Sequence, residues 1–164
     1  PRQRTVPRSE TAPLAFCLGR FFMAAMDPTD AQLREILTEV HHIALVGASA
    51  NPARPAHQVM QFLLQAGYRV SPVNPGLAGQ TLLEQPVAAT LAEVPGPVDM
   101  VDVFRRSEAA PALFEAALAL SPRPAVLWTQ LGVFAGPAGA AASAAGLTVI
   151  ENRCPKIEHL RLGL

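Results

Sequence analysis

The clearest candidate for chemistry in this sequence is a turn that follows a short apolar run. Residues 43–46 read I-A-L-V, and G-A-S-A-N-P-A-R-P follows over residues 47–55. A glycine at the end of a buried strand lets the chain turn sharply. The Ser49 hydroxyl and free N–H groups at a following helix start can then bind an anion, and Arg54 adds a charge suited to a phosphate oxygen. The stretch predicts a phosphate-holding turn; the alternative is a structural turn without a ligand.

The usual dinucleotide fingerprint is incomplete in this turn. Nicotinamide and flavin sites normally carry G-x-G-x-x-G, in which each glycine has a steric role, and here only Gly47 is present. The next apolar run ends at Val73-Asn74-Pro75, without the carboxylate that usually holds the ribose hydroxyls of NAD. Taken alone, Asn74-Pro75 is a turn signal. The pattern argues against NAD and leaves room for a ligand with an extra phosphate on its ribose.

Two further strand ends carry polar or cationic side chains. Phe104-Arg105-Arg106 suits anionic oxygens, although paired arginines at a helix start are as often simply solvated. Trp128-Thr129-Gln130 ends another apolar run. Because the only tryptophan of the chain is more typical of core packing, Gln130 is the better candidate for a ligand contact.

Strands that alternate with helices must bring these turns together. We expect helices over 27–40, 58–65, from a cap at Ser107 to about 120, and over 136–145, and strands over 43–46, 68–73, 98–104, 125–130 and 147–151. A short strand near 86–87 and a helical turn at 90–93 complete the prediction. Apolar strands without alternation indicate a parallel sheet covered on both faces. The predicted fold is α/β, a three-layer, doubly wound, Rossmann-like sheet of five or six strands, which binds ligands at the carboxyl ends of its strands.

Composition limits the remaining possibilities. Half of the 164 residues are hydrophobic, 16% are charged and the formal net charge is zero, so nothing global indicates nucleic acid or a membrane surface. No apolar run approaches the ~20 residues of a membrane span. Two cysteines make no disulfide framework and indicate a reducing cytosol.

The first 26 residues differ from the rest of the chain. They are rich in arginine and proline and poor in acids. Such a segment is either a targeting presequence or an extension upstream of a natural start at Met23 or Met26. We expect residues 1–26 to be disordered or non-native, and residues 27–164 to form the domain.

The ordered set of motifs resembles a known family. The segments V-G-A-S-A-N-P-A-R-P, V-S-P-V-N-P, V-D-M-V-D-V-F-R-R, L-W-T-Q-L-G-V and E-N-R-C-P-K-I-E-H occur in family order and spacing. They are similar to the small standalone bacterial CoA-binding proteins, related to the CoA-binding domain of the succinyl-CoA synthetase alpha subunit. The resemblance runs from about Met26 to the C-terminus and implies coenzyme A, or an acyl-CoA, as the ligand.

The resemblance also implies which residues bind. The loop that wraps the CoA phosphates corresponds to Gly47, Ala48, Ser49, Ala50 and Asn51, with Arg54 beside it. The border of the adenosine part corresponds to Val73, Asn74 and Pro75, the next wall of the cleft to Phe104 and Arg105, and a three-residue CoA contact to Trp128, Thr129 and Gln130. The synthetase loop is richer in glycine, so Ala50 and Pro52 imply a different phosphate geometry here.

No catalytic or metal-binding constellation is visible. The synthetase carries its phosphorylated histidine in a second domain, beyond the matching region, and the four histidines here form no nucleophile or metal arrangement. His57, in a first helical turn, is more typical of a structural role. Cys154, between Arg153 and Lys156, raises the hypothesis of a thiol with lowered pKa that forms a mixed disulfide with CoA; the alternative is an inert, half-buried cysteine.

Three functions therefore stay open on the sequence alone. The first is a non-catalytic CoA-binding protein. The second is an NAD(P)-dependent oxidoreductase or sugar-nucleotide enzyme. The third is a nucleotide-binding regulatory subunit, joined to a partner or to copies of itself.

Overall fold

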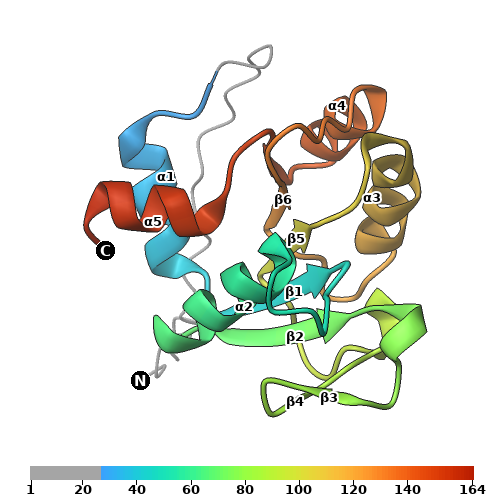
Figure 1. The fold of residues 1–164 in the computed structure, drawn as a ribbon. Coiled ribbons are helices and arrows are strands. Elements are labelled where there is room, and N and C mark those ends of the chain that lie inside the picture. Colours follow the sequence, from blue (N-terminus) through green and yellow to red (C-terminus); the bar gives the residue numbers. More distant parts are fainter. Residues whose placement is uncertain (1–26) are drawn as a thin grey trace, which may run out of the picture.

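A parallel five-stranded sheet forms the centre of the computed structural model, which describes residues 27–164 (Figure 1). The strands are β1 (His42–Val46), β2 (Arg69–Val73), β5 (Met100–Val103), β6 (Val126–Thr129) and β7 (Thr148–Ile150). They lie in the order β2-β1-β5-β6-β7, and every neighbouring pair is parallel. The predicted doubly wound α/β fold is confirmed, with five strands in the main sheet.

Helices cover both faces of the sheet. One layer consists of α1 (Asp30–Glu39), α2 (Pro55–Gln65) and α5 (Pro155–Leu162), and the other of α3 (Ala110–Leu118) and α4 (Pro137–Ala144). Successive strand residues point to opposite faces, so that Leu45 and Trp128 pack in the first layer while Val46 and Leu127 pack in the second. The resulting core has two halves, one on each side of the sheet.

Local signals account for the helix starts. At α1, Thr29 and Gln32 form a reciprocal capping box. At α2, Pro55 occupies the first turn, where a missing N–H costs nothing, so this helix begins earlier than the predicted residue 58.

Ser107 does not cap a helix as predicted. It opens a 3₁₀ turn, η3 (Ser107–Ala109), before α3 begins at Ala110. Its hydroxyl instead accepts a hydrogen bond from the Phe134 N–H at 3.0 Å, which links the loops that follow β5 and β6. The predicted cap was wrong because a tertiary partner competes for the side chain.

Small elements follow β2. These are η1 (Pro75–Leu77), an antiparallel pair of β3 (Thr81–Leu82) and β4 (Gln85–Pro86), and η2 (Leu91–Glu93). The predicted short strand near 86–87 and the helical turn near 90–93 correspond to β4 and η2. Within residues 27–164 no helix is both long enough and apolar enough to cross a membrane. The prediction for residues 1–26 lies outside the described residues.

Candidate functional site

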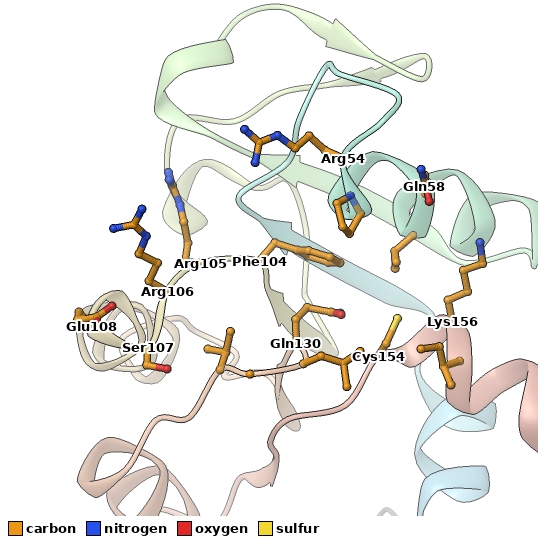
Figure 2. A pocket seen from close by; sticks show the side chains of 16 residues that line it. Arg54, Gln58, Phe104, Arg105, Arg106, Ser107, Glu108, Gln130, Cys154 and Lys156 are labelled. Atoms are coloured by element: carbon orange, nitrogen blue, oxygen red, sulfur yellow. The ribbon is translucent and has the colours of Figure 1, made fainter.

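A cavity of about 950 Å³ lies at the carboxyl ends of the strands (Figure 2). This volume is typical of a small-molecule or cofactor site. Its walls come from the start of α2, the loops after β5 and β6, and the start of α5. The lining residues are Arg54, Pro55, Gln58, Val59, Phe104, Arg105, Arg106, Ser107, Glu108, Gln130, Leu131, Gly132, Val133, Cys154, Lys156 and Ile157.

The first turn is held tightly against the two neighbouring strand ends. The Gly47 N–H donates to the Val73 carbonyl at 2.9 Å, and its φ is +91°. A Cβ placed on Gly47 would overlap the Phe104 carbonyl oxygen. The position therefore requires glycine, both for its backbone angle and for the close approach of β5. The Ala48 side chain is buried below the turn.

Short-range hydrogen bonds shape the rest of this turn. The Ser49 hydroxyl accepts from the Asn51 N–H at 3.2 Å, and the Asn51 carboxamide oxygen accepts from the Ala53 N–H at 2.9 Å. The His57 Nδ1 lies 3.0 Å from the Ser49 carbonyl oxygen. His57 thus has a structural contact from α2, while Ala50 is exposed at the tip of the turn.

The end of β2 supports the first turn rather than lining the cavity. The Asn74 amide donates to the Ala48 carbonyl at 2.7 Å and its carboxamide oxygen accepts from the Gly76 N–H at 2.9 Å. Val73 is buried, and Pro75 begins η1 on the surface. The three residues border the turn, with the polar atoms of Asn74 engaged by backbone.

Cations dominate the rim of the cavity. Arg54, Arg105 and Arg106 gather on one side and Lys156 stands at the opposite end, while Glu108 is the acid among the lining residues (Figure 2). None of these four cations has an ion-pair partner within residues 27–164. Their charges are available to an anionic ligand.

Trp128 and Thr129 hold the cavity loops from below. Both side chains are fully buried. The Trp128 Nε1 donates to the Arg153 carbonyl at 2.7 Å, and the Thr129 hydroxyl donates to the Val133 carbonyl at 2.7 Å. They position the loops 130–133 and 151–154 and do not themselves line the cavity.

Of the residues predicted to bind CoA, four line the cavity directly: Arg54, Phe104, Arg105 and Gln130. Arg106 and Cys154, which the sequence also singled out, line it as well. The other residues predicted to bind CoA lie outside the lining, in the first turn, at the end of β2 and at the end of β6. The contribution of α5 was not predicted, since no helix was expected over those residues. Lys156 and Ile157 reach the cavity from its first turn.

Asp102 is another residue that was not predicted from the sequence. It lies in β5, is completely buried, and accepts from the Gln130 Nε2 at 2.9 Å and 3.2 Å through its two oxygens. Burial raises the pKa of this carboxyl to about 7, and the hydrogen bond from Gln130 opposes that rise. An aspartate inside the apolar run V-D-M-V-D-V-F was the available signal.

The Cys154 thiol faces the cavity but lacks the predicted activation. It is 7% exposed, and its sulfur is directed toward the cavity (Figure 2). Burial raises its pKa, and hydrogen bonds from the Ile157 and Lys156 N–H groups only partly oppose this. The hypothesis of a lowered pKa is wrong, because desolvation outweighs the nearby positive charge, and the alternative of an inert cysteine agrees with the raised pKa. No cluster suited to a metal ion occurs in the part of the chain that the structure describes.

Comparison with known proteins places this chain in a family. Residues 41–160 match the model of the CoA binding domain. The uncharacterized protein YneT of Bacillus subtilis (strain 168) is 37% identical over 133 residues, which covers 81% of this chain and 96% of the relative. The chain belongs to the CoA-binding domain family, which confirms the resemblance inferred from the motifs.

Solved structures agree with that assignment. A Thermus thermophilus protein is 38% identical and has a TM-score of 0.78. The match covers 82% of this chain and 99% of the Thermus chain. A hypothetical protein from Pyrococcus horikoshii OT3 is 36% identical and has a TM-score of 0.78. The match covers 87% of this chain and 100% of the Pyrococcus chain. A dinucleotide-forming acetyl-coenzyme A synthetase of Ca. Korarchaeum cryptofilum shares the fold, with 22% identity and a TM-score of 0.51. The match covers 66% of this chain and 25% of the synthetase chain.

Proposed function

We propose that this protein binds coenzyme A, or an acyl-CoA, in the cavity at the carboxyl ends of its strands. The observation that carries the proposal is the asymmetric lining of that cavity. Three arginines without an ion-pair partner among residues 27–164 lie on one side, and an apolar surface with a thiol and an amide lies beside them, with Lys156 at its far end. CoA has the same asymmetry, since a phosphorylated nucleotide is joined to a largely uncharged pantetheine arm. Membership of the CoA-binding domain family supports the same ligand.

The lining and the family resemblance together support an orientation for CoA. Arg54 and Arg105 line the cavity and hold phosphate, and the Gly47–Asn51 turn beside Arg54 takes part as the resemblance implies. Val73, Asn74 and Pro75, which lie outside the cavity lining and support that turn, border the adenosine part as the family resemblance implies. The pantetheine arm then runs past Phe104 toward Gln130 and Cys154.

The proposed mechanism is recognition rather than catalysis. The residues described offer no nucleophile activated by an adjacent base, and the pKa of Cys154 is raised. A cytosolic, bacterial, non-catalytic binder remains a prediction from the sequence. The same holds for a homo-oligomer or a regulatory partner subunit, and these arrangements are compatible with CoA binding.

Calorimetric titration of the full chain tests the ligand. We expect a dissociation constant on the order of micromolar for CoA, weaker binding of dephospho-CoA, and none of NAD⁺. Arg105→Gln should weaken CoA about tenfold and reduce the salt dependence, because one charge-assisted contact is lost. Arg123→Gln is the matched control, since Arg123 is exposed and bonds the Leu118 carbonyl at the end of α3, outside the cavity lining.

One outcome overturns the proposal. If the protein binds NAD⁺ or NADP⁺ and does not bind CoA, the oxidoreductase hypothesis replaces this proposal. Reduction of NAD(P)⁺ by added metabolites would then be the next measurement.

A further inference from the structure

Asp102 is a buried carboxyl whose only hydrogen-bond partner among the described residues is Gln130. We propose that Asp102 is a positioning residue that turns the Gln130 amide so that its carbonyl oxygen faces the cavity and accepts a hydrogen bond from an amide N–H of the pantetheine arm. This inference rests on the proposed function and adds a determinant of ligand specificity to it.

The orientation of the Gln130 amide follows from its partner. An ionised carboxylate has no proton to donate, so the group facing it must be the amino group of Gln130. The Gln130 Nε2 lies 2.9 Å and 3.2 Å from the two carboxylate oxygens. The Oε1 atom is therefore left for the cavity, and Figure 2 shows it directed inward on the side of Cys154. No donor within residues 27–164 bonds to this oxygen.

The Gln130 Oε1 atom needs a hydrogen-bond donor from the ligand. A hydrogen-bond acceptor in a cavity loses its solvation when a ligand enters, so it needs a donor from that ligand. Phosphate and carbonyl oxygens of CoA are acceptors and do not meet this need. The secondary amides of the pantetheine arm supply N–H donors. The surroundings also suit this arm, because Val59, Phe104 and Leu131 present apolar surface nearby.

Burial of the Asp102 carboxylate lowers the stability of the fold. Its register neighbours in β1 and β6 are the apolar residues Leu45 and Trp128, which do not compensate a charge. A buried carboxylate of this kind is unfavourable for folding alone. Its hydrogen-bond partner among the described residues, Gln130, lines the cavity. This contact gives the carboxylate a role that an apolar residue in β5 would lack.

The direct test compares ligands and variants together. The probes are CoA and a CoA analogue in which the pantetheine amides are replaced by esters, which removes the N–H donors. We expect the full-length wild type to bind CoA about tenfold more tightly than the analogue. In Asp102→Asn, the new amide can donate to Gln130 as well as accept from it, so the Gln130 amide is no longer held in one orientation. The ratio of the two dissociation constants should then fall toward one.

Asp99→Asn is the matched control. Asp99 precedes the same strand, and its carboxylate accepts from the His41 and His42 N–H groups at 2.9 Å and 2.8 Å, away from the cavity. We expect this variant to lose stability and to keep the wild-type preference. A merely structural role for Asp102 would make the two variants behave alike.

A second measurement needs no variant. Protonation of Asp102 lets its O–H donate to the Gln130 oxygen, so the wild-type preference should decline as the pH falls from about 8.5 to about 6. Cys154, the residue before α5, also faces this region, and its raised pKa keeps it neutral in that range. The cavity lining also includes Glu108, Arg54, Arg105, Arg106 and Lys156. Titration of the ligand phosphates affects both probes equally and cancels in the ratio.

The outcomes separate the two proposals. Absence of CoA binding by the wild type rejects the proposed function. Tight CoA binding with a preference that is unchanged in Asp102→Asn, or constant across the pH range, rejects the positioning role and leaves the proposed function standing.

Discussion

Gly47 is the residue on which the first turn depends most. Its φ of +91° and the close approach of the Phe104 carbonyl both exclude a side chain. We expect Gly47→Ala to lower the free energy of unfolding by about 3 kcal/mol or more, because backbone strain adds to steric overlap. CoA affinity should fall in parallel as the turn shifts. Urea denaturation and calorimetry measure the two effects.

Gly67 provides the matched control for that substitution. It follows α2 with a φ of +94°, and a Cβ there would meet nothing within 4 Å. Gly67→Ala should therefore cost only the strain of the backbone angle, about 1 kcal/mol. Equal losses at the two positions would contradict the role assigned to the contact with Phe104.

The buried carboxyl of Asp102 predicts a specific pH dependence of stability. Its folded-state pKa of about 7 lies above its ordinary value of 3.8. Between these values the unfolded chain releases the proton while the folded protein keeps it, so stability falls as the pH rises through this window. The loss approaches an upper limit on the order of 4 kcal/mol above pH 7.

Asp102→Asn removes this contribution to the pH dependence of stability, because the asparagine amide does not titrate. The difference in unfolding free energy between variant and wild type should shift in favour of the variant from about pH 4 to about pH 7, and stay constant above that. Urea denaturation without ligand at a series of pH values measures it. Parallel stability curves for the two proteins would show that Asp102 does not titrate in this window.

At the residue scale, the residue types at the strand ends predicted where the site lies better than they predicted which side chains line it. Arg105 and Gln130 were recognised because they follow apolar runs, and both line the cavity. Trp128 and Thr129 follow the same rule and are buried instead. Side chains alternate along a strand, and those that face the cavity lie where the loop begins. The exact end of the strand could not be predicted from the sequence. Asp102 was overlooked within a strand that is otherwise apolar.

At the scale of elements, α5 is the part that the sequence concealed. It has only eight residues, several of them charged, and its C-terminus depends on Gly163 in a left-handed conformation with φ +66°. Short helices have little intrinsic stability and rely on tertiary contacts, which local propensity does not reveal. This helix nevertheless closes one end of the cavity with Lys156 and Ile157.

Ion pairs through Glu158 fasten α5 in place. Its carboxylate, on a residue 6% exposed, lies 3.0 Å from Arg153 and 2.7 Å from Arg161, and Arg161 also contacts Asp30 of α1 at 2.6 Å. Glu158→Gln removes the buried charge that the two arginines share. We expect the free energy of unfolding to fall by about 1–3 kcal/mol. Alkylation of Cys154 should become several-fold faster, because the start of α5 opens more often.

Glu115→Gln serves as the control for this prediction. Glu115 is exposed on α3, on the opposite face of the sheet, and its side chain has no ion pair among the described residues. Chemical denaturation and thiol alkylation kinetics should show little change for it. An unaltered alkylation rate in Glu158→Gln would mean that α5 is held by its apolar contacts alone.

At the scale of the whole molecule, the sequence pattern was sufficient for the fold. Gly67, Gly132 and Gly146 mark the ends of elements, and the apolar runs between them gave the parallel sheet and its two helical layers. The cavity then followed from a general rule, since loops meet at the carboxyl ends of parallel strands. The exact lining required the tertiary arrangement, because it combines segments from Arg54 to Ile157 that are far apart in the chain.

This arrangement predicts how the whole protein responds to its ligand. CoA would contact four separate segments of the cavity wall, from α2, the β5 and β6 loops, and α5, which come apart on unfolding. A ligand that binds only the folded state stabilises it by about 2.7 kcal/mol when its free concentration is ~100 times the dissociation constant.

Thermal unfolding of the full chain should therefore shift to higher temperature as CoA is added. For a domain of this size we expect a shift of roughly 5–10 °C at saturating CoA. Dephospho-CoA should give a smaller shift, and NAD⁺ none. Added salt should reduce the CoA shift, because screening weakens the contacts from Arg54 and Arg105. A shift that is equally large in high salt and in Arg105→Gln would mean that the phosphates bind elsewhere, since the cationic rim would then contribute nothing to affinity.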